Sequence, residues 1–401
     1  MSAPAGSAAR RSAAGLVSGV LEAGLSLGDQ LAAADGPVAR LAPGERARAQ
    51  GLATSVLRHL GRIDAVIDGF VDRAPPKHAR MALRLAVAEL NVDGIPAHAA
   101  VDGAVTLVRG HPKGRHVAGL VDAVARRIAA AGPELWAGTA EAGLPDWIAG
   151  PVRAEWGEDV LAGIAAAQAR DRVPLDLTPR DPAGAAEVAA ALGAEVLPTG
   201  SVRLAAPGQV SALPGYDAGA WWVQDAAAAV PVRLAGDVAG LRVLDLCAAP
   251  GGKTLQLAAA GAEVTALDVS RRRLGRLEEN LVRTGLSAAI VVADALVWEP
   301  EATFDVIVVD APCTASGTLR RHPDLPPLRR GEDLPALAAL QAGLLGRAAG
   351  WLRPGGRLVY GTCSLLPEEG EAQVAGFLAT HPEMEMVAGD PGAFGLPAEA
   401  A

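Results

Sequence analysis

Two cysteines that follow separate apolar segments are the residues in this sequence best placed to do chemistry. Cys313 lies in the stretch DAPCTASGTLRRHPD, which begins at Asp310, and Cys363 lies in the turn GTCS, Gly361 to Ser364. A lone cysteine is most often a buried structural residue, but two thiols at neighbouring strand ends favour a catalytic pair. The third cysteine is Cys247, and the spacing of the three predicts neither a disulfide framework nor a zinc site.

Two thiols beside a carboxyl group suit one reaction, the methylation of carbon 5 of a cytosine. That carbon is too weakly nucleophilic to take a methyl group from a sulfonium unaided. A thiolate that adds to C6 makes it enamine-like and able to attack, so the thiol must lose its proton near neutral pH. A carboxyl group at the N3/N4 edge stabilises the charge that develops, after which a base removes the C5 proton and the thiol leaves. The residue types alone do not say which thiol adds.

The segment DLCAAPGGKT, Asp245 to Thr254, has the small residues of a loop that a ligand approaches closely. It partly matches the phosphate-binding pattern GxxxxGK[ST], but the first glycine of that pattern falls on Cys247. A nucleoside-triphosphate site is therefore disfavoured, and we expect a loop that meets the amino-acid end of S-adenosylmethionine. The expected loop residues are Cys247, Ala248, Ala249, Pro250, Gly251, Gly252 and Lys253.

Acidic residues at the ends of successive predicted strands support a cofactor site. Asp268 is placed where a carboxylate accepts both ribose hydroxyls in dinucleotide-binding folds. Asp294 ends the next predicted strand, where we expect it to meet the adenine edge, and Asp310 ends the one after that. Each alone is as well explained by a solvated turn, but three in succession favour S-adenosylmethionine binding.

Alternating strand and helix patterns position these residues from 241 onward. Short buried strands separated by helical segments predict a parallel, doubly wound α/β sheet of the Rossmann-like type. Ligands of such sheets bind beyond the carboxyl ends of the strands. The expected strands are 242–246, 263–267, 289–293, 304–309 and 357–361.

Two regions with different sequence patterns precede residue 241. Apolar residues recur at spacings near 3.6 in the first 130 residues, which predicts an all-α bundle. Between 133 and 225 five tryptophans occur among Gly and Pro, and we expect them to be hydrophobic wedges between domains rather than base-stacking platforms. Short elements at 175–177, 185–192, 195–197 and 202–205 predict a small α+β subdomain. The expected domains are 1–132, 133–235 and 236–401.

Length and charge agree with this organisation. The 401 residues suffice for two or three domains, and half of them are hydrophobic, which excludes general disorder. The net charge of -9 combines 16 basic and 11 acidic residues in 1–128 with 20 and 34 in the remainder. No apolar run predicts a membrane helix, and residues 1–11 lack the pattern of a signal peptide. We expect a cytoplasmic chain with no bound metal and no membrane association.

These motifs resemble the bacterial RNA 5-methylcytosine methyltransferase (Sun) family. The stretch PCTASGTLRRHPD and the TCS turn are highly specific for it, and WWVQDAAA (221–228) resembles the family's Gln-Asp segment ahead of the methyltransferase sheet. The segment IPAHAAVDGAVTL (95–107), followed by HVAGLVDAVARRI, resembles the NusB-like module fused to members that act on 16S ribosomal RNA. The resemblance covers roughly residues 16–382.

The resemblance implies a role for each site residue. Cys363 is similar to the family's nucleophile, and Cys313 resembles the thiol that assists product release. Asp310 corresponds to the carboxyl on the base edge and also to a cofactor-site position. The loop from Cys247 to Lys253, with Asp268 and Asp294, matches the family's S-adenosylmethionine contacts. DNA cytosine methyltransferases use the Pro-Cys thiol as nucleophile instead, so this division of roles rests on the resemblance.

The C-terminal end departs from the family pattern. Members usually end in an Asp-Gly-Phe-Phe strand that pairs antiparallel with the fifth strand, whereas this sequence ends at Gly395 to Ala401 without it. We expect residues 383–387 to supply the outermost strand. An unpaired edge beside 358–360 would be an association hazard and would loosen the turn that holds Cys363.

Basic residues in two places are candidates for RNA contact. Backbone binding is electrostatic, so arginine clusters are its footprint, and a solvated helix face is the alternative interpretation. The group after Cys313 is expected beside the target strand, whose base must leave its stack. The candidates are Arg109, Lys113, Arg115, Arg126 and Arg127 in the first group and Arg320, Arg321 and His322 in the second.

The sequence therefore predicts an S-adenosylmethionine-dependent RNA cytosine-C5 methyltransferase that acts on small-subunit ribosomal RNA as a monomer. One rival is the same chemistry on tRNA, which the helical module disfavours. The other is an RNA-binding, antitermination-like factor whose methyltransferase half has lost activity. The intact Asp310, Cys313 and Cys363 argue against that factor, and the missing terminal strand argues for it.

Overall fold

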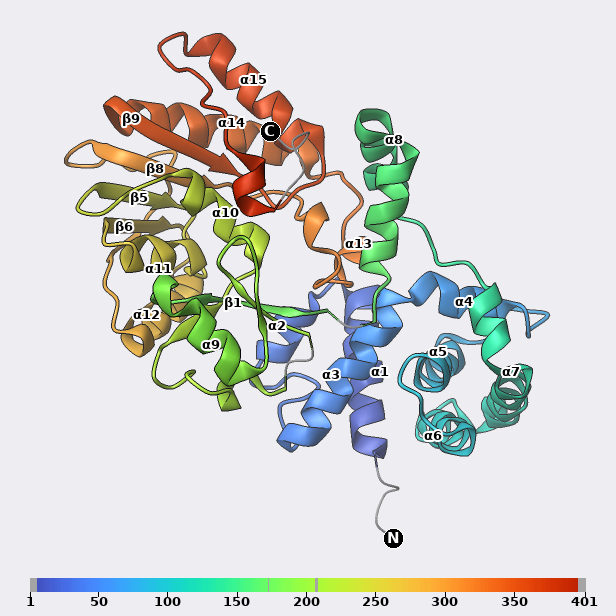
Figure 1. The fold of residues 1–401 in the computed structure, drawn as a ribbon. Helices are drawn as coiled ribbons and strands as arrows, with labels where there is room; N and C mark the ends of the chain where they lie inside the picture. Colours follow the sequence, from blue (N-terminus) through green and yellow to red (C-terminus); the bar gives the residue numbers. More distant parts are fainter. Residues whose placement is uncertain (1–5, 172, 206–207, 396–401) are drawn as a thin grey trace. The chain divides into compact units, whose positions relative to one another are not determined.

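The computed structural model describes residues 6–171, 173–205 and 208–395, and its contacts divide the chain into two compact units (Figure 1). The helical unit comprises Met1–Asp171 and Thr318–Gly331, and the sheet unit comprises Arg172–Gly317 and Glu332–Ala401. This division does not follow the expected boundaries at 132 and 235. The small α+β subdomain belongs to the sheet unit, and a segment from the middle of the methyltransferase region belongs to the helical unit. The expectations for residues 1–5 and for the tail 396–401 fall outside the described residues.

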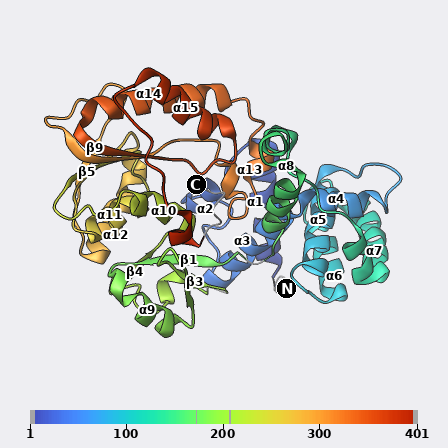
Figure 2. The same cartoon turned by 45° about the horizontal axis from the view of Figure 1, so that its top comes forward.

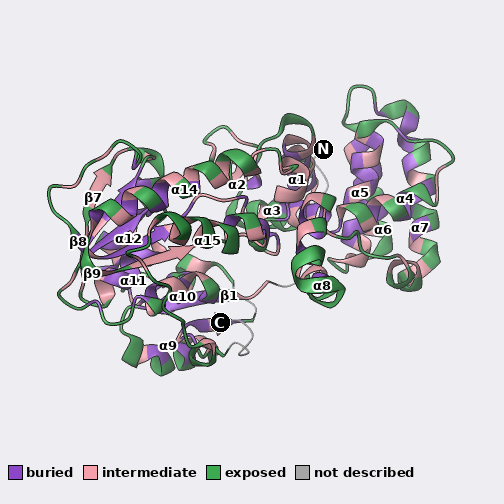
Figure 3. Ribbon diagram, turned by 90° about the horizontal axis from the view of Figure 1, so that it is seen from above, coloured by how far each residue is buried: buried purple, intermediate pink, exposed green. Residues whose placement is uncertain are grey.

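The helical unit is the all-α bundle that the 3.6-residue spacing predicts. Its central helix is α5 (Lys77–Asn91), which carries buried residues on nearly every turn between Ala79 and Glu89 (Figure 3) and packs against α1, α3, α4, α6 and α7. Most residues of this helix are shielded from water, so its apolar side chains form the middle of the core. The helices are α1 (Ser7–Ala23), α2 (Leu27–Ala32), α3 (Pro43–Arg58), α4 (Leu60–Asp68), α5 (Lys77–Asn91), α6 (Ala97–Arg109), α7 (Ala118–Gly138) and α8 (Asp146–Gln168).

The segment Thr318–Gly331, which follows the Cys313 stretch in sequence, is held by the helical unit. The buried carboxylate of Asp324 accepts a hydrogen bond from the Leu27 backbone N–H at 2.8 Å. The carbonyl of Arg320 accepts one from Arg58 Nη1 at 2.7 Å. Leu328, in the short helix α13 (Leu325–Leu328), packs against the bundle core. The chain therefore passes from one unit to the other immediately after the Cys313 loop.

A four-stranded antiparallel sheet opens the sheet unit. Its strands are β1 (Leu175–Pro179), β2 (Glu195–Val196), β3 (Val202–Leu204) and β4 (Trp221–Val223), in the order β2-β3-β1-β4, with α9 (Ala185–Leu192) beside them. The sequence patterns predict three of these strands and miss β4. Trp221 packs in the core of this small sheet, whereas its neighbour Trp222 packs on Ala248 and Leu255 of the next layer. Trp222 therefore packs between the two sheets, as expected of a wedge, whereas Trp221 lies within one core and Trp156 is exposed, which the expectation did not foresee.

The second sheet has the predicted parallel, doubly wound topology. Its strands are β5 (Arg242–Leu246), β6 (Glu263–Asp268), β7 (Ala289–Val292), β8 (Phe304–Asp310) and β9 (Leu352–Gly361), in the order β7-β6-β5-β8-β9. The strand order reverses between β5 and β8, because the chain moves outward to β6 and β7 and then returns to the other side of β5. A crevice beyond the carboxyl ends of β5 and β8 is where such a fold binds its ligands.

Helices cover both faces of this sheet (Figure 2). On one face Leu244 and Ile307 pack against Leu344 of α14 (Leu334–Trp351). On the other face Val243 packs with Val232 of α10 (Ala226–Leu234). The remaining helices of the unit are α10 (Ala226–Leu234), α11 (Gly252–Ala259), α12 (Arg271–Thr284) and α15 (Glu371–Thr380). Burial on both faces explains why the strands read as continuous apolar runs.

The expected outermost strand at 383–387 is wrong. The structure has no strand in that segment, and Met386 and Val387 are exposed. These residues do not pair with β9, which therefore remains the edge of the described sheet. None of the helices in the described ranges is both long and apolar enough to cross a membrane.

Candidate active site

The carboxyl ends of β8 and β9 bring the expected reactive residues together. Asp310, the last residue of β8, is paired in register with Gly361, the last residue of β9. The loops that leave these two positions converge, so that Cys313 Sγ lies 3.3 Å from Cys363 Sγ although the residues are 50 positions apart. Two neighbouring parallel strands thus place both thiols and a carboxylate at one edge of the sheet.

The two thiols have opposite electrostatic environments. The pKa of Cys363 is lowered, chiefly by its hydrogen bond with the Cys313 thiol, and the nearby Lys253 ammonium adds to this effect. The pKa of Cys313 is raised by that same hydrogen bond, by burial and by the charge of Cys363. Cys363 is also the exposed member of the pair. The arrangement favours a thiolate on Cys363 and a protonated thiol on Cys313.

A buried carboxylate holds the loop that carries Cys313. Glu369 is fully buried in the turn that precedes α15, and its Oε1 accepts hydrogen bonds from the Thr314 backbone N–H at 2.9 Å and from Gln341 Nε2 at 3.0 Å. The Thr314 hydroxyl donates to its Oε2. A carboxylate that accepts three donors is firmly placed, so Glu369 fixes the residue next to Cys313.

Hydroxyl and backbone groups join the two cysteine loops. Ser316 Oγ lies 3.1 Å from Ser364 Oγ and accepts a hydrogen bond from the Leu365 N–H. The Gly317 N–H donates to the carbonyl of Cys363 at 2.9 Å. Ala315 has a φ of 58°, a left-handed conformation that costs a non-glycine residue free energy and that surrounding contacts must hold. The sequence patterns predicted neither this network nor the role of Glu369. A glutamate in the polar segment PEEGE (367–371) is typical of the protein surface.

The backbone of the loop after β5 has the conformation that lets a ligand approach it closely. Gly251 has a φ of 109°, and a Cβ there would lie 2.4 Å from Leu277 Cδ1, so the position needs glycine. Cys247 has a φ of 64°. A phosphate-binding loop has a glycine at the position of Cys247. Here the cysteine itself adopts the left-handed conformation that the glycine would otherwise provide. Burial raises the pKa of the Cys247 thiol to about 12, which leaves it protonated and unreactive.

The expected acidic residues line the same edge of the sheet. Asp268 is buried at the end of β6 and accepts hydrogen bonds from the N–H groups of Ala249 and Ser270. Asp294 is exposed beyond β7 and accepts one from the Leu296 N–H. Asp310 Oδ2 lies 2.7 Å from Lys253 Nζ, an ammonium that is almost fully buried. Carboxylates therefore end β6 and β8 on either side of the β5 loop, and a third lies beyond β7.

Asp245 is a further acidic residue beneath the loop. It is completely buried, and burial raises its pKa to about 7. Its Oδ2 accepts a hydrogen bond from Thr254 Oγ1 at 2.5 Å, whereas its Oδ1 has no partner within the described residues. An orphaned buried oxygen, a glycine cradle and carboxylates at neighbouring strand ends suit a ligand with an amino-acid end, a ribose and an adenine. The residues present thus fit S-adenosylmethionine.

Some of the residues expected to contact RNA are exposed, whereas others make contacts within the protein. Arg109, Lys113 and Arg115 are exposed on the helical unit. Arg126 instead pairs with Asp122 on its own helix, and Arg127 lies over the Phe70 ring. In the second group the carbonyl of Arg320 is bound by Arg58, while Arg321 and His322 are exposed. Intramolecular contacts thus engage part of the expected surface.

Comparisons with known proteins cover both units. The profile of the 16S rRNA methyltransferase RsmB/F family matches residues 236–392, and that of the NusB family matches residues 7–130. The chain is 37% identical to ribosomal RNA small subunit methyltransferase B of Xanthomonas campestris pv. campestris, over 94% of this chain and 89% of that protein. The protein of the same name from Klebsiella pneumoniae is 37% identical over 85% of this chain and 83% of its own length.

Solved structures agree with the fold. The crystal structure of a methyltransferase homolog protein from Pyrococcus horikoshii is 29% identical, with a TM-score of 0.50 over 57% of this chain and 77% of that chain. The crystal structure of PH0851, 24% identical, has a TM-score of 0.72 and covers 97% of this chain and 93% of that one, which shows a shared fold. Because the Xanthomonas relative is 37% identical over nearly the whole of this chain, this chain belongs to the 16S rRNA methyltransferase RsmB/F family and carries a NusB family domain at its N-terminus.

Proposed function

We propose that this protein methylates carbon 5 of a cytosine in small-subunit ribosomal RNA, through a covalent bond between Cys363 and C6 of the base. The observation that carries the proposal is the pair of thiols 3.3 Å apart, with pKa values displaced in opposite directions, beside Asp310. The relatives named ribosomal RNA small subunit methyltransferase B support the substrate class.

Residues at the ends of β5, β6 and β7 would hold the methyl donor. The loop from Cys247 to Lys253 would receive its amino-acid end, Asp268 its ribose and Asp294 its adenine. When bound there, S-adenosylmethionine supplies an electrophilic methyl group. Because Lys253 of the cofactor loop is paired with Asp310, that ion pair links the cofactor loop to the end of β8 and fixes the position of the carboxylate.

Cys363 is the residue that adds to the base. Its thiolate forms a bond to C6, and the electron pair displaced from the C5–C6 double bond makes C5 nucleophilic. Asp310 stabilises the charge that develops at the N3/N4 edge. C5 then takes the methyl group while its hydrogen is still in place, so a base must remove that proton before the C6–S bond breaks.

Cys313 is the residue placed to take that proton. Two of the three causes that raise its pKa are its hydrogen bond to Cys363 and the negative charge there. Both vanish once the Cys363 sulfur is a neutral thioether, so the pKa of Cys313 falls at the stage when a base is needed. Cys313 then releases its own proton to solvent, and its thiolate accepts the C5 proton. Removal of the C5 proton restores the double bond and expels Cys363 as a thiolate.

The two rivals differ in substrate or in activity. The same chemistry on tRNA is disfavoured because the NusB family domain occupies residues 7–130. An antitermination-like factor without activity is disfavoured because the thiol pair and the cofactor loop are geometrically complete. We further propose that the protein acts as a monomer in the cytoplasm, the compartment of its RNA substrate.

Methyl transfer from tritiated S-adenosylmethionine to purified RNA tests the proposal. We expect label in 16S rRNA and little in tRNA, and bisulfite sequencing should locate the label at a cytosine. Calorimetry with S-adenosylmethionine separates the rivals, since an inactive factor with a lost cofactor site gives no heat of binding. Label in tRNA alone, or label at a purine, would reject the proposal.

A further inference from the structure

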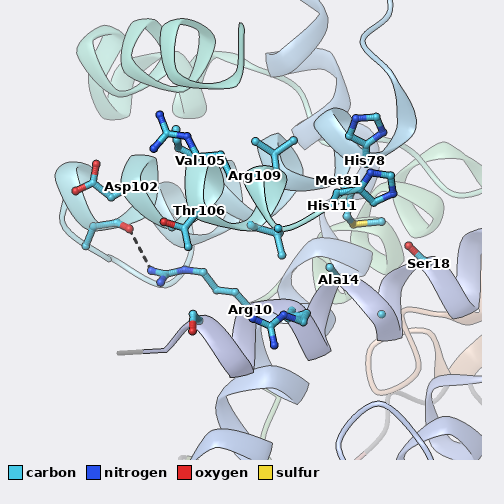
Figure 4. A pocket seen from close by; sticks show the side chains of 18 of the residues that line it. Arg10, Ala14, Ser18, His78, Met81, Asp102, Val105, Thr106, Arg109 and His111 are labelled. Atoms are coloured by element: carbon cyan, nitrogen blue, oxygen red, sulfur yellow. Dashed lines mark hydrogen bonds between the residues drawn. The ribbon is translucent and has the colours of Figure 1, made fainter. Parts of the chain in front are cut away.

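A small cavity in the sheet unit is not explained by methyl transfer. Its volume is about 240 Å³, and residues of β1, α10 and α11 line it together with the turn at Gly200. It is separate from the larger cavity of the helical unit, which residues of α1, α5 and α6 line (Figure 4). Exposed residues are also part of its lining, so the cavity opens to solvent; they are Pro182, Gly236 and Ala260.

Arg233 of α10 is the charged residue in the described lining of this cavity. Its Nε is buried and has no hydrogen-bond partner within the described residues, and it forms no ion pair with any of them. Burial lowers the pKa of Arg233, and no neighbouring carboxylate opposes that effect. Gly200 lies so close that a Cβ there would be 2.5 Å from Arg233 Nη2. Because an arginine stays protonated, a half-buried one without a counter-charge suits an anion from outside the chain.

A buried hydroxyl lies in the same wall. Thr178 of β1 is 3% exposed, and its Oγ1 has no hydrogen-bond partner in the described part of the chain. Successive side chains of a strand point to opposite faces, so Thr178 shares a face with Asp176, whose carboxylate accepts the Ala226 N–H at the start of α10. Thr178 therefore points toward the helix that carries Arg233. Roughly nine in ten buried polar atoms are hydrogen-bonded in proteins, so two unpaired donors at one cavity indicate a ligand.

The other polar side chains near these donors are engaged within the protein. Asp176 accepts hydrogen bonds from Arg203 Nε at 2.7 Å and Arg203 Nη2 at 2.8 Å, which is a bidentate ion pair. Gln256, which also lines the cavity, has both ends of its amide hydrogen-bonded within the chain. Neither residue supplies the acceptor that Arg233 lacks.

The rest of the lining is largely apolar. Trp222 is the cross-strand partner of Thr178 and so lies on the same face of the small sheet. Since one water takes about 30 Å³ in the liquid, the cavity has room for roughly eight or nine non-hydrogen atoms. It therefore fits a ring or a branched chain of modest size with one charged group. The remaining apolar residues of the lining include Pro179, Val232, Val238 and Ala259.

We propose that this cavity binds a small organic anion, with its carboxylate on Arg233 and Thr178 and its apolar body against Trp222. The guanidinium fork matches the two oxygens of a carboxylate, and the Thr178 hydroxyl donates one further hydrogen bond. A carboxylate of the size of benzoate satisfies the charge, both unpaired donors and the apolar wall together. The inference does not rest on the proposed function, because the cysteine loops and the cofactor loop contribute no residue to the described lining.

Fluorine magnetic resonance of para-fluorobenzoate with the full chain tests the site. The ligand tumbles slowly when bound, so we expect its signal to broaden and to sharpen again when unlabelled benzoate displaces it. The amide para-fluorobenzamide has the same ring without the charge and should bind at least tenfold more weakly. Inorganic phosphate has the charge without the ring and should compete at least tenfold more weakly than benzoate.

Two variants remove the two donors separately. Arg233→Met removes the charge and keeps most of the length of the side chain, so we expect at least a tenfold loss of affinity for para-fluorobenzoate. Thr178→Val keeps the shape and removes one hydrogen bond, so we expect about a fivefold loss. Arg276→Met is the matched control, because Arg276 is exposed on α12 and lies outside the described lining. Its affinity should equal that of the wild type.

Thermal melts give a readout that a purely structural role would not share. Without ligand, Arg233→Met and Thr178→Val should melt at or above the Tm of the wild type, because each removes a buried polar atom that has no partner. Benzoate at ten times its Kd should raise the Tm of the wild type by about 4 °C and that of Arg233→Met far less. Calorimetry with S-adenosylmethionine is the control for folding and should give the same Kd in every variant.

Three results would overturn the proposal. They are an unbroadened para-fluorobenzoate signal, equal affinities of Arg233→Met and the wild type, and phosphate that binds more tightly than benzoate, which would mean a site for an inorganic ion only. Methyl transfer is assayed separately. A chain that binds benzoate but transfers no methyl group refutes the proposed function alone, and the reverse result refutes this site alone.

Discussion

Cys313 Sγ and Cys363 Sγ lie 3.3 Å apart, and their hydrogen bond moves the pKa values of the two thiols in opposite directions. This relationship supports the proposed division of roles between the two thiols. The pKa of Cys363 is the lowered one, and Cys363 is also the exposed thiol. Because a thiolate and not a thiol attacks carbon, the geometry favours Cys363 as the residue that adds to the base.

Alkylation should follow this order of ionisation. With limiting iodoacetamide near pH 7.5 we expect Cys363 to be modified first, Cys313 more slowly, and Cys247 last, because its pKa is raised to about 12 by burial. In Cys313→Ala the hydrogen bond between the two thiols is lost, so the pKa of Cys363 rises and its alkylation profile moves to higher pH. Peptide mass spectrometry across pH 6–10 measures both effects. Preferential labelling of Cys313 would contradict the assignment.

Replacement of each thiol should stop the reaction at a different stage. Cys363→Ala cannot form the bond to C6, so we expect neither methyl transfer nor a covalent product. Cys313→Ala can still form it but lacks the base that removes the C5 proton, so a protein–RNA adduct should accumulate. A denaturing gel with labelled RNA detects that adduct, and the double variant is the control that should show none. Equal activity in both single variants, with no adduct in either, would reject the two-thiol scheme.

Glu369 should act as a positioning residue for Cys313. Glu369→Gln replaces one acceptor oxygen with a donor that faces Thr314 or Gln341, so one of their hydrogen bonds is lost. We expect kcat to fall about tenfold or more, since small displacements of reacting groups are costly, with the KM for S-adenosylmethionine unchanged. The loss of a buried hydrogen bond to a charged group should also lower Tm by roughly 5 °C.

The neighbouring residue offers a matched control for that prediction. Glu368 is exposed, and Glu368→Gln changes the same chemical group one position away. We expect its kcat, Tm and alkylation profile to match those of the wild type. A purely structural role for Glu369 would lower Tm while the alkylation profile of Cys363 stays in place, so a shift of that profile distinguishes positioning from stability.

The parallel sheet could be predicted because both of its faces are buried. Strands such as β5 and β8 are then continuous apolar runs, and acidic residues at their ends mark the ligand edge. The strand β4 was missed because three residues, Trp221–Val223, carry no periodicity, and their partner β1 lies more than 40 positions earlier. The expected strand at 383–387 was wrong because strand propensity alone does not supply a neighbour.

Other features depend on contacts that the sequence does not reveal. The cysteine motifs predicted that Cys313 and Cys363 would meet, but not that Glu369 would be buried behind them, since glutamate is rarely buried. The sequence also does not reveal that Thr318–Gly331 belongs to the helical unit, because the contacts that hold it there, such as the hydrogen bond from Leu27 to Asp324, join residues far apart in the chain. The RNA candidates were chosen by charge alone, so Arg126, which is paired with Asp122, could not be told apart from Arg109.

Asp245 should make the stability of the sheet unit depend on pH. Burial raises its pKa from 3.8 to about 7, so the folded state prefers the protonated carboxyl. The stability that this preference contributes is complete below pH 4 and is lost as the pH rises through about 7. Asp245→Asn keeps a neutral side chain, so we expect its Tm to exceed that of the wild type by an amount that grows between about pH 4 and 7 and is constant above that range. Asp294→Asn, which removes an exposed carboxyl at another strand end, is the control and should show no such trend. Thermal melts of the three proteins at matched ionic strength measure the difference, and parallel Tm curves for Asp245→Asn and the wild type would mean that Asp245 is ionised throughout.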